Sequence, residues 1–163
     1  KHIAESIEAM HTVHKRFPDW KLEIIGSGKQ QTECEELIRK LDAGSYVELR
    51  GWVDHSNLQN RTGKWKYLLF PTDTEGMPNG FIEMMGCGIP AIASPVGGIA
   101  DVMQDGENGM ILSDRTADAI AAGMERAILL PEEAYRKMAE NAYETIGKRF
   151  TLKAAQEAAS KYL

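Results

Sequence analysis

Two carboxylates, Glu75 and Glu83, lie eight positions apart on either side of a turn rich in Gly, Pro and Asn. The apolar run at residues 67–70 predicts a buried parallel strand, and residues 81–85 have the composition of a helix start. We therefore expect Glu75 on the loop that leaves the strand and Glu83 in the first turn of the helix. Both acids then lie at one edge of a sheet.

The segment between the two acids is predicted to bind an anion. The backbone N–H groups of Asn79, Gly80 and Phe81 open the expected helix, where free N–H groups attract anions such as phosphate. Each flanking carboxylate can accept two hydrogen bonds from a vicinal diol. A sugar nucleotide offers this combination, since its diphosphate lies between ribose and hexose hydroxyls. In the simpler alternative, Glu83 only complements the helix dipole, worth roughly 0.3–1 kcal/mol, and Glu75 is an exposed loop acid.

Length and composition favour a single intracellular α/β domain. The chain has 163 residues, enough for one core, and is 43% hydrophobic and 26% charged. Its net charge of −5 gives no sign of a basic surface for nucleic acid or anionic lipid, and local basic patches stay open. Cys34 and Cys87 stand outside any CxxC pattern, which favours reduced thiols. No apolar run approaches the roughly 18 residues of a membrane helix, and no signal peptide is expected.

Apolar strand patterns alternate with amphipathic helix patterns along the chain, which predicts a Rossmann-like parallel sheet flanked by helices. Strands are expected at residues 21–25, 46–49, 67–70, 91–93 and 109–112. Helices are expected at residues 3–16, 29–41, 56–60, 80–87, 116–130, 131–148 and 152–162, with one helical turn within 97–103.

The region around the two acids resembles a known enzyme family. The spacing from Glu75 to Glu83 is similar to the E-x7-E motif of retaining GT-B glycosyltransferases of the large family 4, or group 1, type. Other segments resemble the same family in the same order: LEIIGSG at 22–28, VELRGWV at 47–53, Pro71-Thr72, MMGCGIP at 84–90, ASPVGG at 93–98 and DGENG at 105–109. The resemblance covers nearly the whole chain.

The resemblance implies the C-terminal, donor-binding half of a GT-B fold. It assigns the donor hexose to Glu75, taken as the catalytic residue, and the ribose to Glu83. The other donor-binding residues that it implies are Lys1 at the diphosphate, Gly26 and Gly28 in a turn, Val53 at the base, and Gly76, Met77, Pro78, Asn79 and Gly80 between the two acids. No metal is expected, because backbone amides and Lys1 would stabilise the leaving diphosphate.

The chain opens directly on a helix pattern, whereas the family's C-terminal domain normally begins with a strand. We expect residues 1–163 to form one nucleotide-sugar-binding domain that lacks its first strand, which would leave an edge or a gap in the sheet. The family's N-terminal acceptor domain is also missing from this sequence. The fragment alone is therefore expected to bind donor weakly and to transfer nothing.

The implied reaction is transfer of a hexose from a UDP-, GDP- or ADP-sugar to a hydroxyl acceptor, with retention of configuration. The acceptor, a sugar, a glycolipid or a lipid carrier, would be bound by the missing domain. The implied location is the cytoplasm, with room for peripheral membrane contact of the full-length protein. A nucleotide-sugar epimerase, a phosphorylase and a non-catalytic nucleotide-binding domain stay open as alternatives.

Other conspicuous residues have simpler explanations. The turn Gly26-Ser27-Gly28 does not fit the dinucleotide fingerprint, because Gln31 stands where its third glycine is needed. His2, His11 and His14 have helical spacing on a polar face. No histidine is expected to take part in catalysis.

Overall fold

The computed structural model describes residues 1–54 and 61–150. Its strands are β1 (Leu22–Ile25), β2 (Val47–Gly51), β3 (Leu68–Phe70), β4 (Ala91–Ala93) and β5 (Gly109–Ile111). Its helices are α1 (Ile3–His14), α2 (Gln31–Lys40), the 3-10 helix η1 (Thr62–Lys64), α4 (Asn79–Gly86), α5 (Gly98–Val102), α6 (Ala117–Ile128) and α7 (Glu132–Arg149). The expected helices at 56–60 and 152–162 lie outside the described residues.

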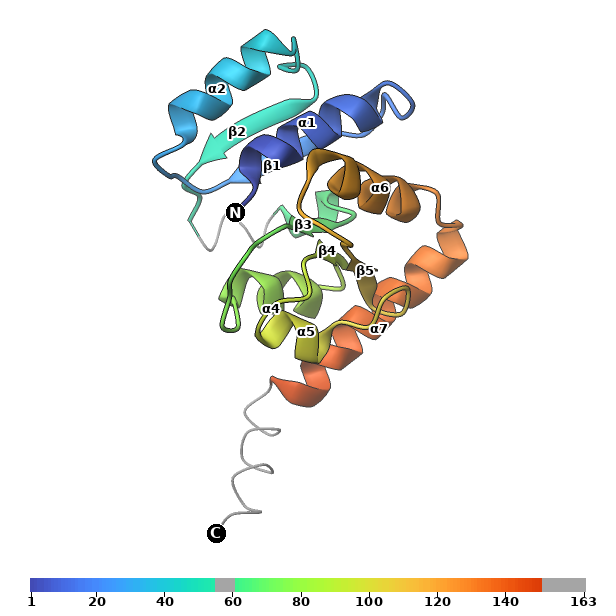
Figure 1. Cartoon of the computed structure of the whole chain (residues 1–163). Coiled ribbons are helices and arrows are strands. Elements are labelled where there is room, and N and C mark those ends of the chain that lie inside the picture. Colours follow the sequence, from blue (N-terminus) through green and yellow to red (C-terminus); the bar gives the residue numbers. More distant parts are fainter. Residues whose placement is uncertain (55–60, 151–163) are drawn as a thin grey trace.

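The strands form two parallel ladders rather than one continuous sheet. β1 pairs with β2, and β3, β4 and β5 pair in that order. Figure 1 shows the first ladder in the upper part of the molecule and the second below it. Among the described residues no ladder joins β1 to β3, so each of these two strands has one unpaired edge. This arrangement agrees with the expectation of an edge or a gap in the sheet.

Alternate residues of the three-stranded ladder belong to two separate parts of the core. Leu69, Ile92 and Met110 are neighbours in the ladder and pack with the buried faces of α1 and α6. Phe70 and Ala93 pack with α4, α5 and α7 instead. This follows from the two-residue repeat of a strand, which sends successive side chains to opposite faces.

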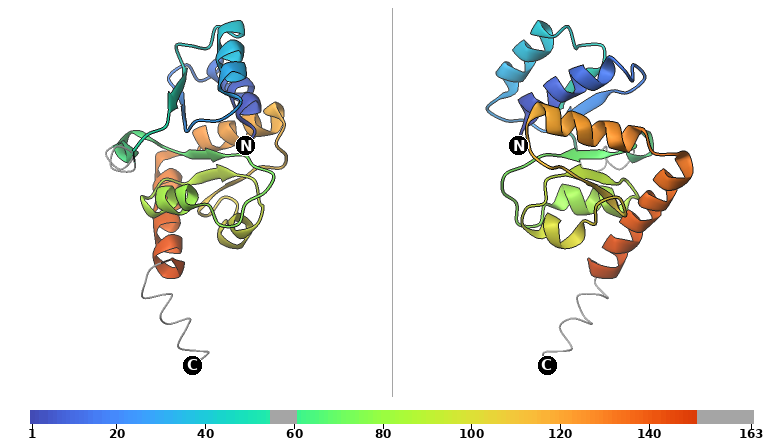
Figure 2. Two further views of the ribbon diagram at one scale, coloured as in Figure 1. Left: turned by 90° about the vertical axis from the view of Figure 1, so that its left-hand side faces the viewer. Right: turned by 45° about the vertical axis from the view of Figure 1, so that its right-hand side comes forward.

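Helices cover both faces of the β3–β4–β5 ladder. α1 packs against α6, and α4 packs against α7. The right-hand view of Figure 2 shows α6 on one side of the three strands and α4 and α5 on the other. The Rossmann-like α/β class predicted from the sequence is therefore confirmed, and all three strands of this ladder end close to the loops that carry the expected site.

Thr116 caps helix α6, and its removal gives a first testable prediction. Its hydroxyl accepts a hydrogen bond from the Ala119 N–H at 3.3 Å. Thr116→Ala should lower the free energy of unfolding by about 1 kcal/mol, because one N–H at the helix start loses its acceptor. Urea denaturation measures the change. Thr116→Ser keeps the hydroxyl and should stay close to the unchanged chain; equal losses in both variants would refute a role for the cap.

Candidate functional site

The loop after β3 carries Glu75 to a position beside the start of α1. Lys1 forms an ion pair with the Glu75 carboxylate. The Lys1 ammonium nitrogen also lies 3.6 Å from the centroid of the Phe70 ring, in a cation–π contact. Thr72 Oγ1 donates to Glu75 Oε1 at 3.4 Å. The structure thus brings together two of the residues that the resemblance assigns to the donor, Lys1 and Glu75.

The other side of this loop rests on the backbone of Gly97 and Gly98. The Gly98 N–H donates to the Gly76 carbonyl at 2.7 Å. Gly97 has a φ of +50°, and a Cβ built on it would lie 1.8 Å from the Glu75 carbonyl oxygen. A Cβ on Gly98 would lie 2.5 Å from Met77 Cε. Only glycine fits position 97, which lets this segment fix the backbone of Glu75.

Helix α4 begins where the sequence predicts an anion site. Pro78 is extended, with φ −74° and ψ 127°, and the helix starts at Asn79. Within the described residues, the exposed Asn79 and Gly80 have no backbone acceptor for their N–H groups. The Phe81 N–H, in contrast, donates to the Pro78 carbonyl at 3.1 Å. The expectation of three free amides is therefore wrong for Phe81, because the carbonyl before the helix accepts from its third residue.

Glu83 lies on α4, but not in its first turn. Since the helix starts at Asn79, Glu83 is its fifth residue, and the first turn holds no acidic side chain. The expected placement is wrong because the helix begins one residue earlier than predicted. The simple explanation of Glu83 as a complement to the helix dipole loses its basis, because that effect falls off within the first turn. Glu83 is partly buried.

The loops after β1 and β2 carry the remaining expected donor-binding residues. Gly26 has a φ of +120°, and its N–H donates to the Gly51 carbonyl at 2.7 Å, which joins the two loops. Gly26 and Gly28 are exposed, and a Cβ on either would meet no atom within 4 Å. Val53 is partly buried next to Trp52, which is 72% exposed. These loops follow the carboxyl ends of parallel strands, where open α/β sheets bind their ligands.

A cluster of charged side chains at the start of α1 was not predicted from the sequence. His2 Nε2 lies 2.9 Å from Asp73 Oδ1, and His2 Nδ1 lies 3.1 Å from Glu5 Oε1. Arg115 Nε donates to the Thr72 carbonyl at 3.0 Å and lies 3.4 Å from Asp73 Oδ1. The spacing of three between His2 and Glu5 signals their contact. Asp73 is 71 positions from His2, and no local pattern signals that contact.

These side chains border a small polar cavity. Its volume is about 200 Å³, and it is lined by Lys1, His2, Glu5, Gln30 and Asp73. The cavity lies where the start of α1 meets the loops after β1 and β3. Ligand pockets that enclose a drug-sized molecule measure about 300–1,000 Å³. The cavity that the described residues form is therefore too small to enclose a ligand of that size.

Comparison with known proteins assigns the chain to a family. Residues 1–145 match the family model described as "Glycosyl transferases group 1". The chain belongs to this family. The resemblance to group 1 glycosyltransferases and the Rossmann-like, C-terminal half of a GT-B fold are thereby confirmed.

Three similar proteins illustrate this membership of the group 1 glycosyl transferases. The GtfA subunit of a UDP-N-acetylglucosamine–peptide N-acetylglucosaminyltransferase from Streptococcus parasanguinis is 31% identical over 119 residues, which are 72% of this chain and 23% of the relative. The pneumococcal O-GlcNAc transferase GtfA, solved with UDP and GlcNAc, superposes with a TM-score of 0.84 at 25% identity, over 99% of this chain and 32% of that one. The C-terminal domain of a group 1 family protein from Francisella tularensis superposes at 0.80 and 21% identity, over 91% of this chain and 79% of that domain.

This chain is shorter than the relatives that it matches. The chain spans about a quarter of the length of the Streptococcus parasanguinis relative. In residues 1–54 and 61–150 there is no group of three or more His, Cys, Asp and Glu side chains arranged to hold a metal ion. None of the described helices is both long enough and apolar enough to cross a membrane.

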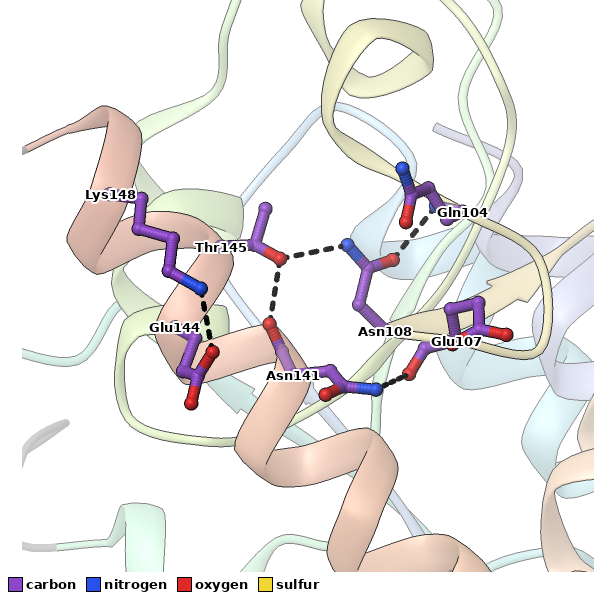
Figure 3. Close-up of a pocket in the computed structure, with 7 residues that line it drawn as sticks. All are labelled: Gln104, Glu107, Asn108, Asn141, Glu144, Thr145 and Lys148. Carbon is purple, nitrogen blue, oxygen red and sulfur yellow. Dashed lines mark hydrogen bonds and ion pairs between the residues drawn. The ribbon is translucent and has the colours of Figure 1, made fainter.

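A second depression, between the α5–β5 loop and α7, has a structural explanation. Its volume is about 180 Å³, and Figure 3 shows its lining side chains joined by hydrogen bonds. Asn108, which is 2% exposed, donates to the Val102 carbonyl at 3.0 Å and to Thr145 Oγ1 at 3.2 Å, and accepts from the Gln104 N–H at 2.8 Å. Asn108 therefore anchors the loop before β5 to α7.

Proposed function

We propose that this chain is the donor-binding half of a retaining glycosyltransferase. It binds a nucleoside diphosphate sugar at the carboxyl ends of β1, β2 and β3, and the hexose passes to a hydroxyl acceptor held by another part of the whole protein. The observation that carries the proposal is the Lys1–Glu75 ion pair, with Glu75 four residues before a helix start whose Asn79 and Gly80 amides have no backbone acceptor among the described residues. A cation, free amides and a carboxylate are the groups that a diphosphate joined to a sugar requires.

The chemical problem in this reaction is charge. When the nucleotide leaves, negative charge grows on the diphosphate while the anomeric carbon becomes cationic. The N–H dipoles of Asn79 and Gly80, together with Lys1, stabilise the leaving group from fixed positions, as an oxyanion hole does. Glu75 orients the hexose by accepting hydrogen bonds from its hydroxyls, and Glu83 holds the ribose. The protein supplies these groups without a metal ion.

The contact between Lys1 and Glu75 suggests how the donor enters. Without a ligand, the Lys1 ammonium neutralises the Glu75 carboxylate. A bound diphosphate competes for Lys1, because it carries more negative charge than one carboxylate and can accept several hydrogen bonds. Glu75 is then released to accept hydrogen bonds from the sugar. Donor binding and preparation of Glu75 are therefore one event in this proposal.

Calorimetric titration tests the proposed donor site. The Streptococcus parasanguinis relative is a subunit of a UDP-N-acetylglucosamine–peptide N-acetylglucosaminyltransferase, and the pneumococcal GtfA was solved with UDP and GlcNAc. UDP-N-acetylglucosamine is therefore the first probe, followed by UDP, GDP and ADP. We expect weak but saturable binding of one nucleotide class to this chain. Absence of binding of all four probes at millimolar concentration, to this chain and to a longer chain with the expected first strand restored, would refute the donor site.

A change at Glu83 tests the assignment of the ribose. Glu83→Ala should weaken binding of the nucleotide by about 1–3 kcal/mol, or roughly 5- to 150-fold, because charge-assisted hydrogen bonds to the ribose are lost. The matched control is Glu144→Ala, which removes an exposed helical carboxylate paired with Lys148 on α7. The control should bind as the unchanged chain does. Equal nucleotide affinities of the two variants would show that Glu83 does not bind the ribose.

A further inference from the structure

The ring of His2 lies between two carboxylates from different parts of the chain. Its Nε2 is 2.9 Å from Asp73 on the β3–α4 loop, and its Nδ1 is 3.1 Å from Glu5 on α1. The His2 side chain is only 21% exposed. A ring that donates from both nitrogens is an imidazolium, because a neutral imidazole has a single N–H. In its protonated form, His2 therefore links α1 to the β3–α4 loop as a cation.

Asp73 also has a second cationic partner. Arg115, on the loop before α6, places its Nε 3.4 Å from the same Asp73 oxygen and donates to the Thr72 carbonyl at 3.0 Å. The Asp73 side chain is 67% exposed, and ion pairs with that exposure add little to global stability. Its contacts are better explained by what they do locally, which is to hold the first residues of the β3–α4 loop between two other elements.

Lys1 and His2 each form an ion pair with the β3–α4 loop. Lys1 pairs with Glu75, and His2 pairs with Asp73 two residues earlier in the same loop. A shift of Asp73 away from His2 moves the backbone that leads to Glu75. The contact of His2 with Asp73 thus sets where the Glu75 carboxylate lies relative to the Lys1 ammonium group.

We propose that His2 is a positioning residue for donor binding, which holds Asp73 so that Lys1 and Glu75 face the same nucleotide sugar and releases it on losing its proton. The proposal rests on the donor site described above. His2 does not touch the donor in it; it acts through Asp73 and the loop. The affinity for a donor of constant charge then depends on pH.

The direction of this pH dependence follows from the titration of the two partners. The hydrogen bond to Asp73 is the largest cause that raises the pKa of His2 above its ordinary value of 6.5; burial opposes it, and Glu5 adds to it. The contact is therefore complete below pH 6.5 and is lost as the pH rises through the raised value. The hydrogen bond from His2 lowers the pKa of Asp73 from 3.8, so acid breaks the contact only below that value.

Several other charged groups face this contact. Glu5 belongs to α1, Arg115 to the loop before α6, and Lys1 contributes its side chain. Gln30, from the β1–α2 loop, completes the cavity as a neutral side chain. The test has to separate these groups from His2. A variant that lacks only the imidazole does so.

The experiment compares binding of UDP-N-acetylglucosamine at about pH 6 and about pH 8.5, between which the ordinary histidine titrates and the diphosphate diester of the probe keeps its charge. For the unchanged chain we expect affinity to be about two- to fivefold lower at the higher pH, the size expected for the loss of one exposed ion pair. His2→Gln should bind weakly at both pH values. Asp73→Asn should lose more affinity at the lower pH than Glu5→Gln, because Glu5 contacts His2 from within α1. The same pH dependence in the unchanged chain and in His2→Gln would overturn the proposal and leave the donor site intact.

A second measurement needs no ligand, so it separates this proposal from the proposed function. In proton–nitrogen NMR spectra, the amide resonances of Gly76 and Gly80 should shift with the same midpoint as the His2 ring. In Asp73→Asn, the His2 midpoint should fall toward its ordinary value, and the loop resonances should no longer follow it. Loop resonances that ignore the His2 titration in the unchanged chain would refute the positioning role, whether or not any nucleotide binds.

Discussion

Replacing Gly97 with alanine should destabilise the chain by about 2–5 kcal/mol and weaken donor binding by about tenfold or more. Gly97 has a φ of +50°, which an alanine adopts only with strain, and the new Cβ would lie 1.8 Å from the Glu75 carbonyl oxygen. The neighbouring atoms are backbone, so no side chain can rotate away. The Glu75 loop has to move, and displacement of a binding group by about 1 Å is enough for large losses.

The matched control is Gly147→Ala on the exposed side of α7. A Cβ there meets no atom within 4 Å, and Gly147 has no positive φ. Because alanine is the better helix former, this variant should be more stable by about 0.5–1 kcal/mol. Urea denaturation and calorimetry with UDP-N-acetylglucosamine measure both variants. If Gly97→Ala unfolds at the same urea concentration as the unchanged chain, the contact between Gly97 and Glu75 does not exist in solution.

The sequence predicted the fold well because most of its signals are local. The apolar runs that contain Leu69, Ile92 and Met110 gave the strands of the second ladder, and their parallel order follows from the helices between them. The loop position of Glu75 followed from the end of β3. Helix ends were less accurate: the early start of α4 at Asn79 moved Glu83 out of the first turn and gave the Phe81 N–H an acceptor.

The contacts that complete the candidate site are not local, so no periodicity signalled them. Lys1 meets Glu75, and His2 meets Asp73, only because α1 packs so that its start lies at the end of β3. The division of the strands into two ladders is likewise a property of tertiary pairing. Local patterns place residues on elements, whereas partners across elements depend on the packed structure.

Phe81 should be the most costly side chain to truncate near the site. It is fully buried in the core between α4 and the β3–β4–β5 ladder, and its ring centroid lies 6.3 Å from that of Phe70. Phe81→Ala should lower the free energy of unfolding by about 3–5 kcal/mol through lost burial and the cavity left behind. For a chain of this size, the unfolding temperature should fall by about 6–20 °C, which calorimetry measures. Phe81 is also the third residue of α4, so the amides of Asn79 and Gly80 lose their support and nucleotide affinity should fall too.

Two variants separate burial from aromatic character in this result. Tyr143→Ala truncates an aromatic residue of α7 that is 61% exposed, and should change the free energy of unfolding by less than about 1 kcal/mol. Phe81→Leu keeps most of the buried volume and should lose less than half as much stability as Phe81→Ala. Since the cost arises from the cavity, stability should follow the volume retained at position 81. Equal losses for Phe81→Ala and Tyr143→Ala would show that α4 does not pack on the ladder as described, and the amides at its start would then have no fixed position in the segment that follows Glu75.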